Sequence, residues 1–230
     1  MMPHRCQYTL LLASLPHQPR QFFSDGRTLL SREQLDRRLR LLDASDAAEL
    51  QRIEALAQGF QFENENDETM LSSYLETAGR ILNDEMRRLA LWHLELRILL
   101  SALRLRLAGA SAPERTSFPG AGTWQDAIKK NWHKNDFGLG YRVPWLADAH
   151  ALLANGRPHE LEKFLLELIW RHYIEVGNRH YFDFTAVALY VLRWDLSRRW
   201  SSYRGDEAVA CFDRLVETGL KDCDLSLEIR

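Results

Sequence analysis

Three residues lie close enough in the sequence to suggest metal chemistry: His172, Glu175 and His180. Imidazole and carboxylate groups together are common ligands of transition metals. On a helix, however, His172 and Glu175 are ordinary i, i+3 neighbours, and a break at Gly177-Asn178 separates them from His180. We therefore expect structural pairing here. A helical enzyme with a spatially assembled metal site at these residues is kept as the alternative from a different functional class.

Other catalytic signatures are absent from the sequence. It has no HExxH motif, no Glu-x-x-His pair, no phosphate-binding GxxxxGKS or GxxxxGKT loop and no GxSxG elbow. Asp136-Phe137-Gly138 matches a kinase tripeptide, but the catalytic and glycine-rich loops of kinases are missing. We expect a protein that is not an enzyme, with no catalytic residues, no cofactor and no metal site.

The composition of the chain argues against some classes of binding partner and indicates a cellular compartment. The 230 residues carry a net charge of −2, so there is no long-range field of the kind that attracts nucleic acid. The cysteines are Cys6, Cys211 and Cys223, an odd number without CxxC spacing, which fits a reducing cytoplasm. The longest apolar region, Leu89 to Leu107, is interrupted by charged residues, so no membrane-spanning segment is expected.

Most of the chain has the sequence pattern of helices, and only the first residues hint at period-two alternation. Two segments, 83–108 and 184–203, are apolar on two opposite faces at the 3.6-residue helical period. A helix that is apolar on both sides lies inside a bundle, or covers its own core with one face and a partner with the other. The sequence therefore predicts an all-α helical bundle.

Local start signals place the other helices. Capping boxes or first-turn prolines predict helix starts at Ser31 with Gln34, Asp46 with Glu49, Thr123 with Asp126, Pro144, Pro158, Asp183 and Asp206. The first of these helices is expected to run to about Asp43, and the last to about Gly219. Residues 60–68 are rich in Glu and Asp and are expected to form a solvated loop.

The richest run of glycine and proline, Gly109 to Gly122, marks the clearest internal boundary. We expect an N-terminal helical unit at 1–110, a linker at 111–122, a C-terminal helical unit at 123–220 and a tail at 221–230. Offsetting the two bifacial helices by 89 residues aligns Leu103-Arg104 with Leu192-Arg193. This indicates a pair of pseudo-repeated helical units, although leucine-rich helices also match one another by chance.

Four blocks of sequence resemble a known family: Tyr8 to Pro16, Asn135 to Leu139, Glu162 to Trp170, and Tyr181-Phe182-Asp183 leading to Arg199-Trp200. The family, of undefined function, consists of bacterial proteins associated with V-type (A/V-type) ATPase gene clusters, and the resemblance spans about Tyr8 to Val216. That family is similar in turn to the C subunit of the V-type ATPase, also called the d subunit, an all-helical adaptor between the central stalk and the membrane rotor ring.

The resemblance implies a non-catalytic adaptor subunit, or alternatively an assembly factor for the same ATPase. Its partners would be the stalk and rotor-ring subunits, at the cytoplasmic face of the membrane, with membrane contact only through them and none with nucleic acid. The candidate partner-binding residues are Arg193, Arg198, Arg199, Trp200 and Tyr203. The chain departs from the family pattern in one respect. It has room for about two such helical units, whereas the adaptor subunit of the ATPase resembles a set of three. We therefore do not expect this chain to form the closed funnel of that adaptor.

Overall fold

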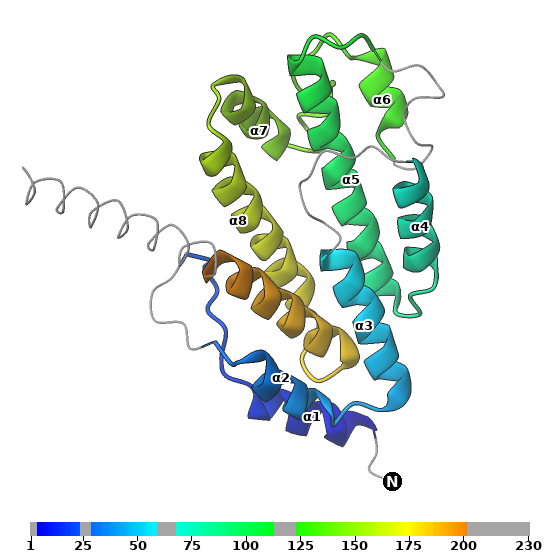
Figure 1. Ribbon diagram of the computed structural model, residues 1–230, viewed down its shortest axis with the longest axis vertical. Coiled ribbons are helices and arrows are strands. Elements are labelled where there is room, and N and C mark those ends of the chain that lie inside the picture. Colours follow the sequence, from blue (N-terminus) through cyan, green and yellow to red (C-terminus); the bar gives the residue numbers. More distant parts are fainter. Residues whose placement is uncertain (1–3, 24–28, 59–67, 113–122, 202–230) are drawn as a thin grey trace, which may run out of the picture.

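The computed structural model describes residues 4–23, 29–58, 68–112 and 123–201. Within these ranges the protein consists of helices and their connections, without a strand, which confirms the all-α class. The helices, arranged as in Figure 1, are α1 (His4–Ser14), α2 (Arg32–Leu39), α3 (Ala44–Gln58), α4 (Glu68–Gly79), α5 (Asp84–Leu107), α6 (Gln125–Lys130), α7 (Trp145–Ala154), α8 (Pro158–Gly177) and a further helix at 184–201.

Several helix starts agree with the sequence signals. Ser31 forms the expected capping box on α2, with its hydroxyl 3.2 Å from the backbone nitrogen of Gln34 and the Gln34 side chain 3.1 Å from the backbone nitrogen of Ser31. Asp183 caps helix 184–201 by accepting a 2.8 Å hydrogen bond from the backbone of Ala186. These bonds satisfy amide groups that the first turn of a helix leaves unpaired.

Other boundaries differ from the predictions. Helix α3 begins at Ala44 because Asp43, not Asp46, accepts the first-turn amide, that of Asp46, at 2.8 Å. Thr123 does not cap α6, since its side chain instead bonds the carboxylate of Glu95. The first described residues form α1 rather than a strand, and α2 ends at Leu39 rather than Asp43. The helix predicted from Asp206 and nearly all of the acidic loop at 60–68 lie outside the described residues.

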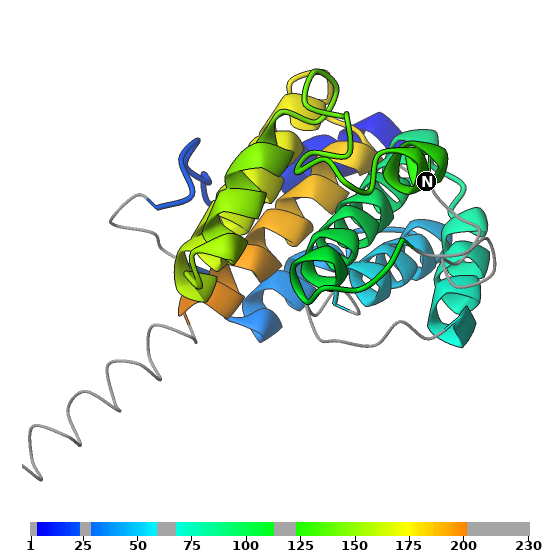
Figure 2. The same ribbon diagram turned by 90° about the horizontal axis from the view of Figure 1, so that it is seen from above.

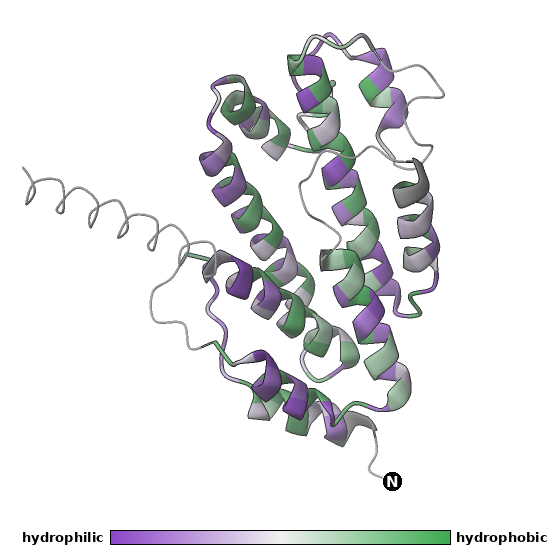
Figure 3. Cartoon of the chain, in the orientation of Figure 1, coloured by the Kyte–Doolittle hydropathy of each residue, from purple (hydrophilic) through white to green (hydrophobic). Residues whose placement is uncertain are grey.

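Helix 184–201, orange in Figures 1 and 2, runs through the middle of the bundle between α8 on one side and α2 and α3 on the other. Val187 and Trp194 are buried on one face, and Leu189 and Leu196 on the opposite one. Helix α5 also buries side chains on two faces, and Figure 3 shows hydrophobic residues alternating with hydrophilic ones along its visible side. Both bifacial helices are therefore interior elements, as the hydrophobic pattern predicts.

The N-terminal segment packs against helices that are far away in the sequence. The indole nitrogen of Trp170 donates to the carbonyl of Arg20 at 3.0 Å, and that of Trp194 donates to the carbonyl of Leu30 at 2.9 Å. The Gln18 side chain donates to the carbonyl of Tyr190 at 3.0 Å. These three bonds tie the segment to α8 and to helix 184–201, and they give the two indole N–H groups a partner.

Buried side chains from both sides of the predicted 111–122 linker belong to one hydrophobic cluster, which includes Leu11, Leu99, Leu146 and Trp194. Helix α7 contacts both α5 and α8, and so joins the segments before and after the linker. Among the described residues, no helix is both long enough and apolar enough to cross a membrane. The division into two units and their pseudo-repeat stay predictions of the sequence.

Candidate interaction surface

The motif residues of helix 184–201 divide between its interior and its surface. Arg199 is bonded to buried Asp195, with Nε at 3.0 Å and Nη2 at 2.7 Å from Oδ2. Arg199 also donates to the carbonyl of Ala57 in α3 at 3.1 Å. Because the same guanidinium binds its own helix and the end of α3, it acts as an internal clamp.

Arg193 is the second internal arginine. Its guanidinium lies 5.8 Å from the centre of the Trp170 ring in α8, and its Nε is 3.4 Å from the carbonyl of Leu189. Burial lowers the pKa of Arg193 to about 10, because desolvation disfavours the charged form. The group still carries its charge at neutral pH, so it fixes α8 to helix 184–201 through a cation–π contact.

Arg198 and Trp200 lie nearer the solvent. Just over half of the Arg198 side chain is exposed, and its guanidinium lies 5.4 Å from the ring centre of Trp194. The Trp200 ring is half-buried and faces Phe23, at 5.3 Å between ring centres. Tyr203 lies outside the described residues. Of the five predicted residues, the structure therefore leaves Arg198 exposed, and Arg199 and Trp200 partly buried.

Residues from two other segments surround Trp200. His159 of α8 stacks on it at 6.3 Å between ring centres, and the Lys163 amine lies 5.8 Å from its centre. Phe23 is 44% exposed and rests on buried Phe22. We call the set Phe23, His159, Lys163, Arg198 and Trp200 the Trp200 surface. It combines exposed aromatic area with basic side chains, and its tryptophan and arginine are residue types that recur in the energetic centres of protein interfaces.

The sequence pattern did not identify Phe23, His159 or Lys163 as part of this surface. They lie 37 to 177 positions from Trp200, and although Lys163 falls within the Glu162 to Trp170 block, nothing in that block indicates a contact with Trp200. The paired phenylalanines at 22 and 23 are the one available signal, since an exposed aromatic in a polar segment often marks a contact site. They reach Trp200 through the packing of α8, and of the N-terminal segment, against helix 184–201.

The buried polar residues form a second cluster, beneath this surface. The Tyr173 hydroxyl of α8 lies 3.1 Å from Nε2 of His93 in α5, and both residues are buried. Desolvation lowers the pKa of His93 to about 3 and raises that of the Tyr173 phenol. His93 is therefore neutral at physiological pH, and the pair ties α5 to α8.

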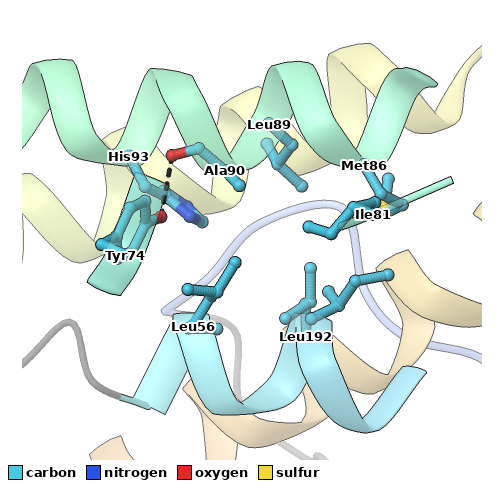
Figure 4. Close-up of a pocket in the computed structure, with 10 residues that line it drawn as sticks. Leu56, Tyr74, Ile81, Met86, Leu89, Ala90, His93 and Leu192 are labelled. Carbon is cyan, nitrogen blue, oxygen red and sulfur yellow. Dashed lines mark hydrogen bonds between the residues drawn. The ribbon is translucent and has the colours of Figure 1, made fainter. Parts of the chain in front are cut away.

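His93 also borders a small apolar cavity. Figure 4 shows His93 and Tyr74 at one end of it and Ile81, Met86 and Leu192 toward the other, with the Tyr74 hydroxyl bonded to the carbonyl of Ala90 at 2.8 Å. Its volume is about 10 Å³. Substrate pockets are typically some hundreds of Å³, so this cavity is a packing void and not a substrate site.

The proposed metal ligands are not assembled. His180 is bonded to Asp183, with Nδ1 2.6 Å from Oδ2, whereas His172 stacks on Trp92 at 3.9 Å between ring centres. His172 Nδ1 lies 3.9 Å from Glu175 Oε2, the i, i+3 pairing that the helical spacing predicts. Among the residues that the structure describes, no group of three or more His, Cys, Asp or Glu side chains is arranged to hold a metal ion.

Comparison with known proteins adds no relative. No protein-family model, no curated protein and no solved structure matches the chain. The similarity to the ATPase-associated family therefore rests on the four sequence blocks, and the interaction surface rests on the geometry described above.

Proposed function

We propose that this chain is a non-catalytic subunit of a V-type ATPase and acts as an adaptor between the central stalk and the membrane rotor ring. The sequence blocks suggest the ATPase, and the helical architecture suits a part that transmits force. Its partners are subunits of that complex, and it reaches the cytoplasmic face of the membrane through them.

The observation that carries the proposal is the double role of helix 184–201. Its middle is buried against α2, α3 and α8, while its last turns contribute Arg198 and Trp200 to the surface. A partner bound at the Trp200 surface would therefore load the central helix of the bundle directly. Because protein interiors are close-packed and resist compression, that load would pass to the whole body with little deformation.

The Asp195–Arg199 clamp supports the same role. It lies one helical turn from Trp200 and joins the end of helix 184–201 to the end of α3 through the Ala57 carbonyl. A surface that holds a partner under torque needs such rigid support. If its side chains were mobile, binding would have to order them, and that loss of conformational entropy would weaken the affinity.

Isolation of the intact ATPase from cells that express a tagged form of this chain at its natural level tests the proposal. We expect the chain in the complete complex at a stoichiometry of one or a small whole number per rotor. Its presence only in incomplete complexes would identify an assembly factor instead. Its absence from both would refute the link to the ATPase.

Two surface substitutions test the site separately from the complex. Phe23→Ser and Lys163→Glu change accessible groups of the Trp200 surface, so the fold should be retained. Each is expected to reduce co-purification with the partner at least tenfold, as is typical of an interface centre. Arg171→Glu, at an arginine whose side chain is 64% exposed on α8, is the matched charge-reversal control and should bind normally.

A further inference from the structure

The connection between α6 and α7 is built as a rigid loop. The two carboxylate oxygens of Asp136 accept hydrogen bonds from the backbone nitrogens of Gly138, at 2.9 Å, and Gly140, at 3.2 Å. From α5, the Arg106 guanidinium lies 2.7 Å from Oδ1 of Asn135 and 2.9 Å from Nε2 of His150. These bonds fix the loop to two helices, α5 and α7.

The centre of this loop is strained. Phe137 has a φ of 50°, a conformation that residues other than glycine adopt rarely. Its side chain is completely buried, stacks on Trp132 at 5.6 Å between ring centres, and has the Arg106 guanidinium 5.8 Å from its own centre. Backbone strain of this kind persists only where the surrounding structure imposes it, and it concentrates at functional sites.

The rigid loop displays an aromatic residue among basic ones. Tyr141 is fully exposed, and its neighbour Arg142 lies on the surface with its guanidinium 5.9 Å from the ring centre of Trp124. We call the exposed residues of this region the 130–142 tip: Lys130, His133, Lys134, Tyr141 and Arg142.

The charge balance of this region is positive. Three of the five lysines of the chain fall in 129–134, and Arg106 at the end of α5 lies beside them, bonded to Lys134 and Asn135. The acidic groups nearby include Asp126, Asp136, Asp148 and Glu95, of which Asp136 and Glu95 are engaged by the loop's own backbone and by Thr123. The tip is thus a local basic surface on a chain whose net charge is −2.

We propose that the 130–142 tip is a docking site for an acidic segment of a partner protein, with Tyr141 as its anchor. Positive charge on the tip complements an acidic segment and speeds its encounter. A rigid tyrosine supplies contact area with little loss of conformational entropy. The inference concerns a different face from the Trp200 surface and does not depend on the adaptor role.

The composition of the tip favours a protein partner over a membrane or nucleic acid. Shallow insertion into a lipid surface requires several apolar side chains together, whereas Phe137 and Leu139 point into the core and leave Tyr141 as the large exposed side chain of the loop. Binding of single strands requires successive stacking rings along a basic groove, and one exposed ring does not provide that.

Fluorescence anisotropy with a short fluorescein-labelled oligo-glutamate peptide that contains one leucine tests the proposal on the full-length chain. We expect saturable binding that weakens about tenfold when salt rises from about 50 mM to about 300 mM. Tyr141→Ala should weaken binding about tenfold and leave the thermal midpoint unchanged, because the side chain is fully exposed.

A matched pair of double variants separates the tip from net charge. Lys134→Glu/Arg142→Glu should abolish binding, whereas Arg80→Glu/Arg171→Glu makes the same charge change at exposed sites outside the tip and should retain it. Equal loss in both double variants would overturn the proposal. The proposal would also be overturned if the chain bound phosphatidylserine vesicles or oligo-dT more tightly than the peptide, and if Lys134→Glu/Arg142→Glu weakened that binding.

Discussion

Arg198 and Arg199 are adjacent and chemically alike, but they differ in exposure and in the groups that they contact. Arg198 is more than half exposed and covers Trp194, whereas Arg199 reaches inward to a carboxylate that is 7% exposed. The difference follows from the helical period, which turns successive residues by about 100°. Both arginines pair with buried Asp195, but Arg199 lies 2.7 Å from Oδ2 whereas Arg198 lies 3.8 Å from Oδ1.

Removal of Arg199 should therefore be more costly than removal of its neighbour. We expect Arg199→Met to lower the free energy of unfolding by about 2 kcal/mol, because buried Asp195 would lose both of its hydrogen bonds and keep only the 3.8 Å pair with Arg198. Arg198→Met, the comparison, should lower it by less than about 1 kcal/mol, because that ion pair is long and half-exposed. Urea denaturation followed by tryptophan fluorescence measures both, and equal effects would show that the clamp contributes little.

Buried His93 makes the stability of the protein depend on pH. Its pKa of about 3 in the folded state is below the ordinary value of 6.5, so the unfolded chain binds a proton first as the pH falls. Stability from this residue is present above pH 6.5 and is lost between pH 6.5 and 3. Lowering the pH from 7 to 5 should cost about 2 kcal/mol through His93 alone.

Comparison with His93→Gln isolates this effect from the other histidines. Glutamine can still bond the Tyr173 hydroxyl but does not titrate, so the difference between the two proteins in unfolding free energy should shrink by about 2 kcal/mol between pH 7 and 5. Urea titrations at both pH values provide the measurement. An unchanged difference would mean that His93 titrates normally.

At the scale of the helices, the sequence was sufficient where the signal was local. The Ser31 box, the Asp183 cap and the two bifacial helices were predicted correctly, because capping and hydrophobic period depend on residues within one or two turns. The predictions that Asp46 and Thr123 cap their helices were wrong, because other residues form the bonds concerned. A neighbouring aspartate supplied the bond at α3, and a distant glutamate on α5 drew Thr123 away from α6.

The loop between α6 and α7 can be tested through its glycine at 138. Gly138 has a φ of 68°, and a Cβ added there would lie 3.3 Å from the Asn131 side chain. Gly138→Ala should therefore lower the unfolding free energy by about 1–2 kcal/mol. Gly79→Ala, at the end of α4 where a Cβ meets nothing within 4 Å, should be neutral or slightly stabilising. Thermal denaturation of both variants distinguishes strain from a general effect of alanine.

The candidate site was less predictable than the helices. The motif positions identified Arg198 and Trp200, but Phe23, His159 and Lys163 join them only through packing of the N-terminal segment and of α8 against helix 184–201. Such contacts are set by tertiary geometry, and no local pattern encodes them. The sequence also could not separate the internal arginines from the exposed one, because that requires knowing which face of helix 184–201 meets α3.

For the molecule as a whole, the continuous core predicts cooperative unfolding. Buried residues on both sides of 111–122 share one cluster, and α7 joins α5 to α8. We expect a single transition in urea, with tryptophan fluorescence and far-UV circular dichroism giving coincident curves. Two separated transitions would show instead that the predicted N-terminal and C-terminal units unfold independently.

The indole bonds from Trp170 and Trp194 to the carbonyls of Arg20 and Leu30 have a consequence for biosynthesis. The N-terminal segment that carries these carbonyls leaves the ribosome first, yet its partners are made 150 and 164 residues later. At about 5–20 residues per second, it waits on the order of ten to thirty seconds before they are available. The nascent chain is thus a natural client for a holding chaperone, and truncation at the C-terminal end should harm the N-terminal segment first.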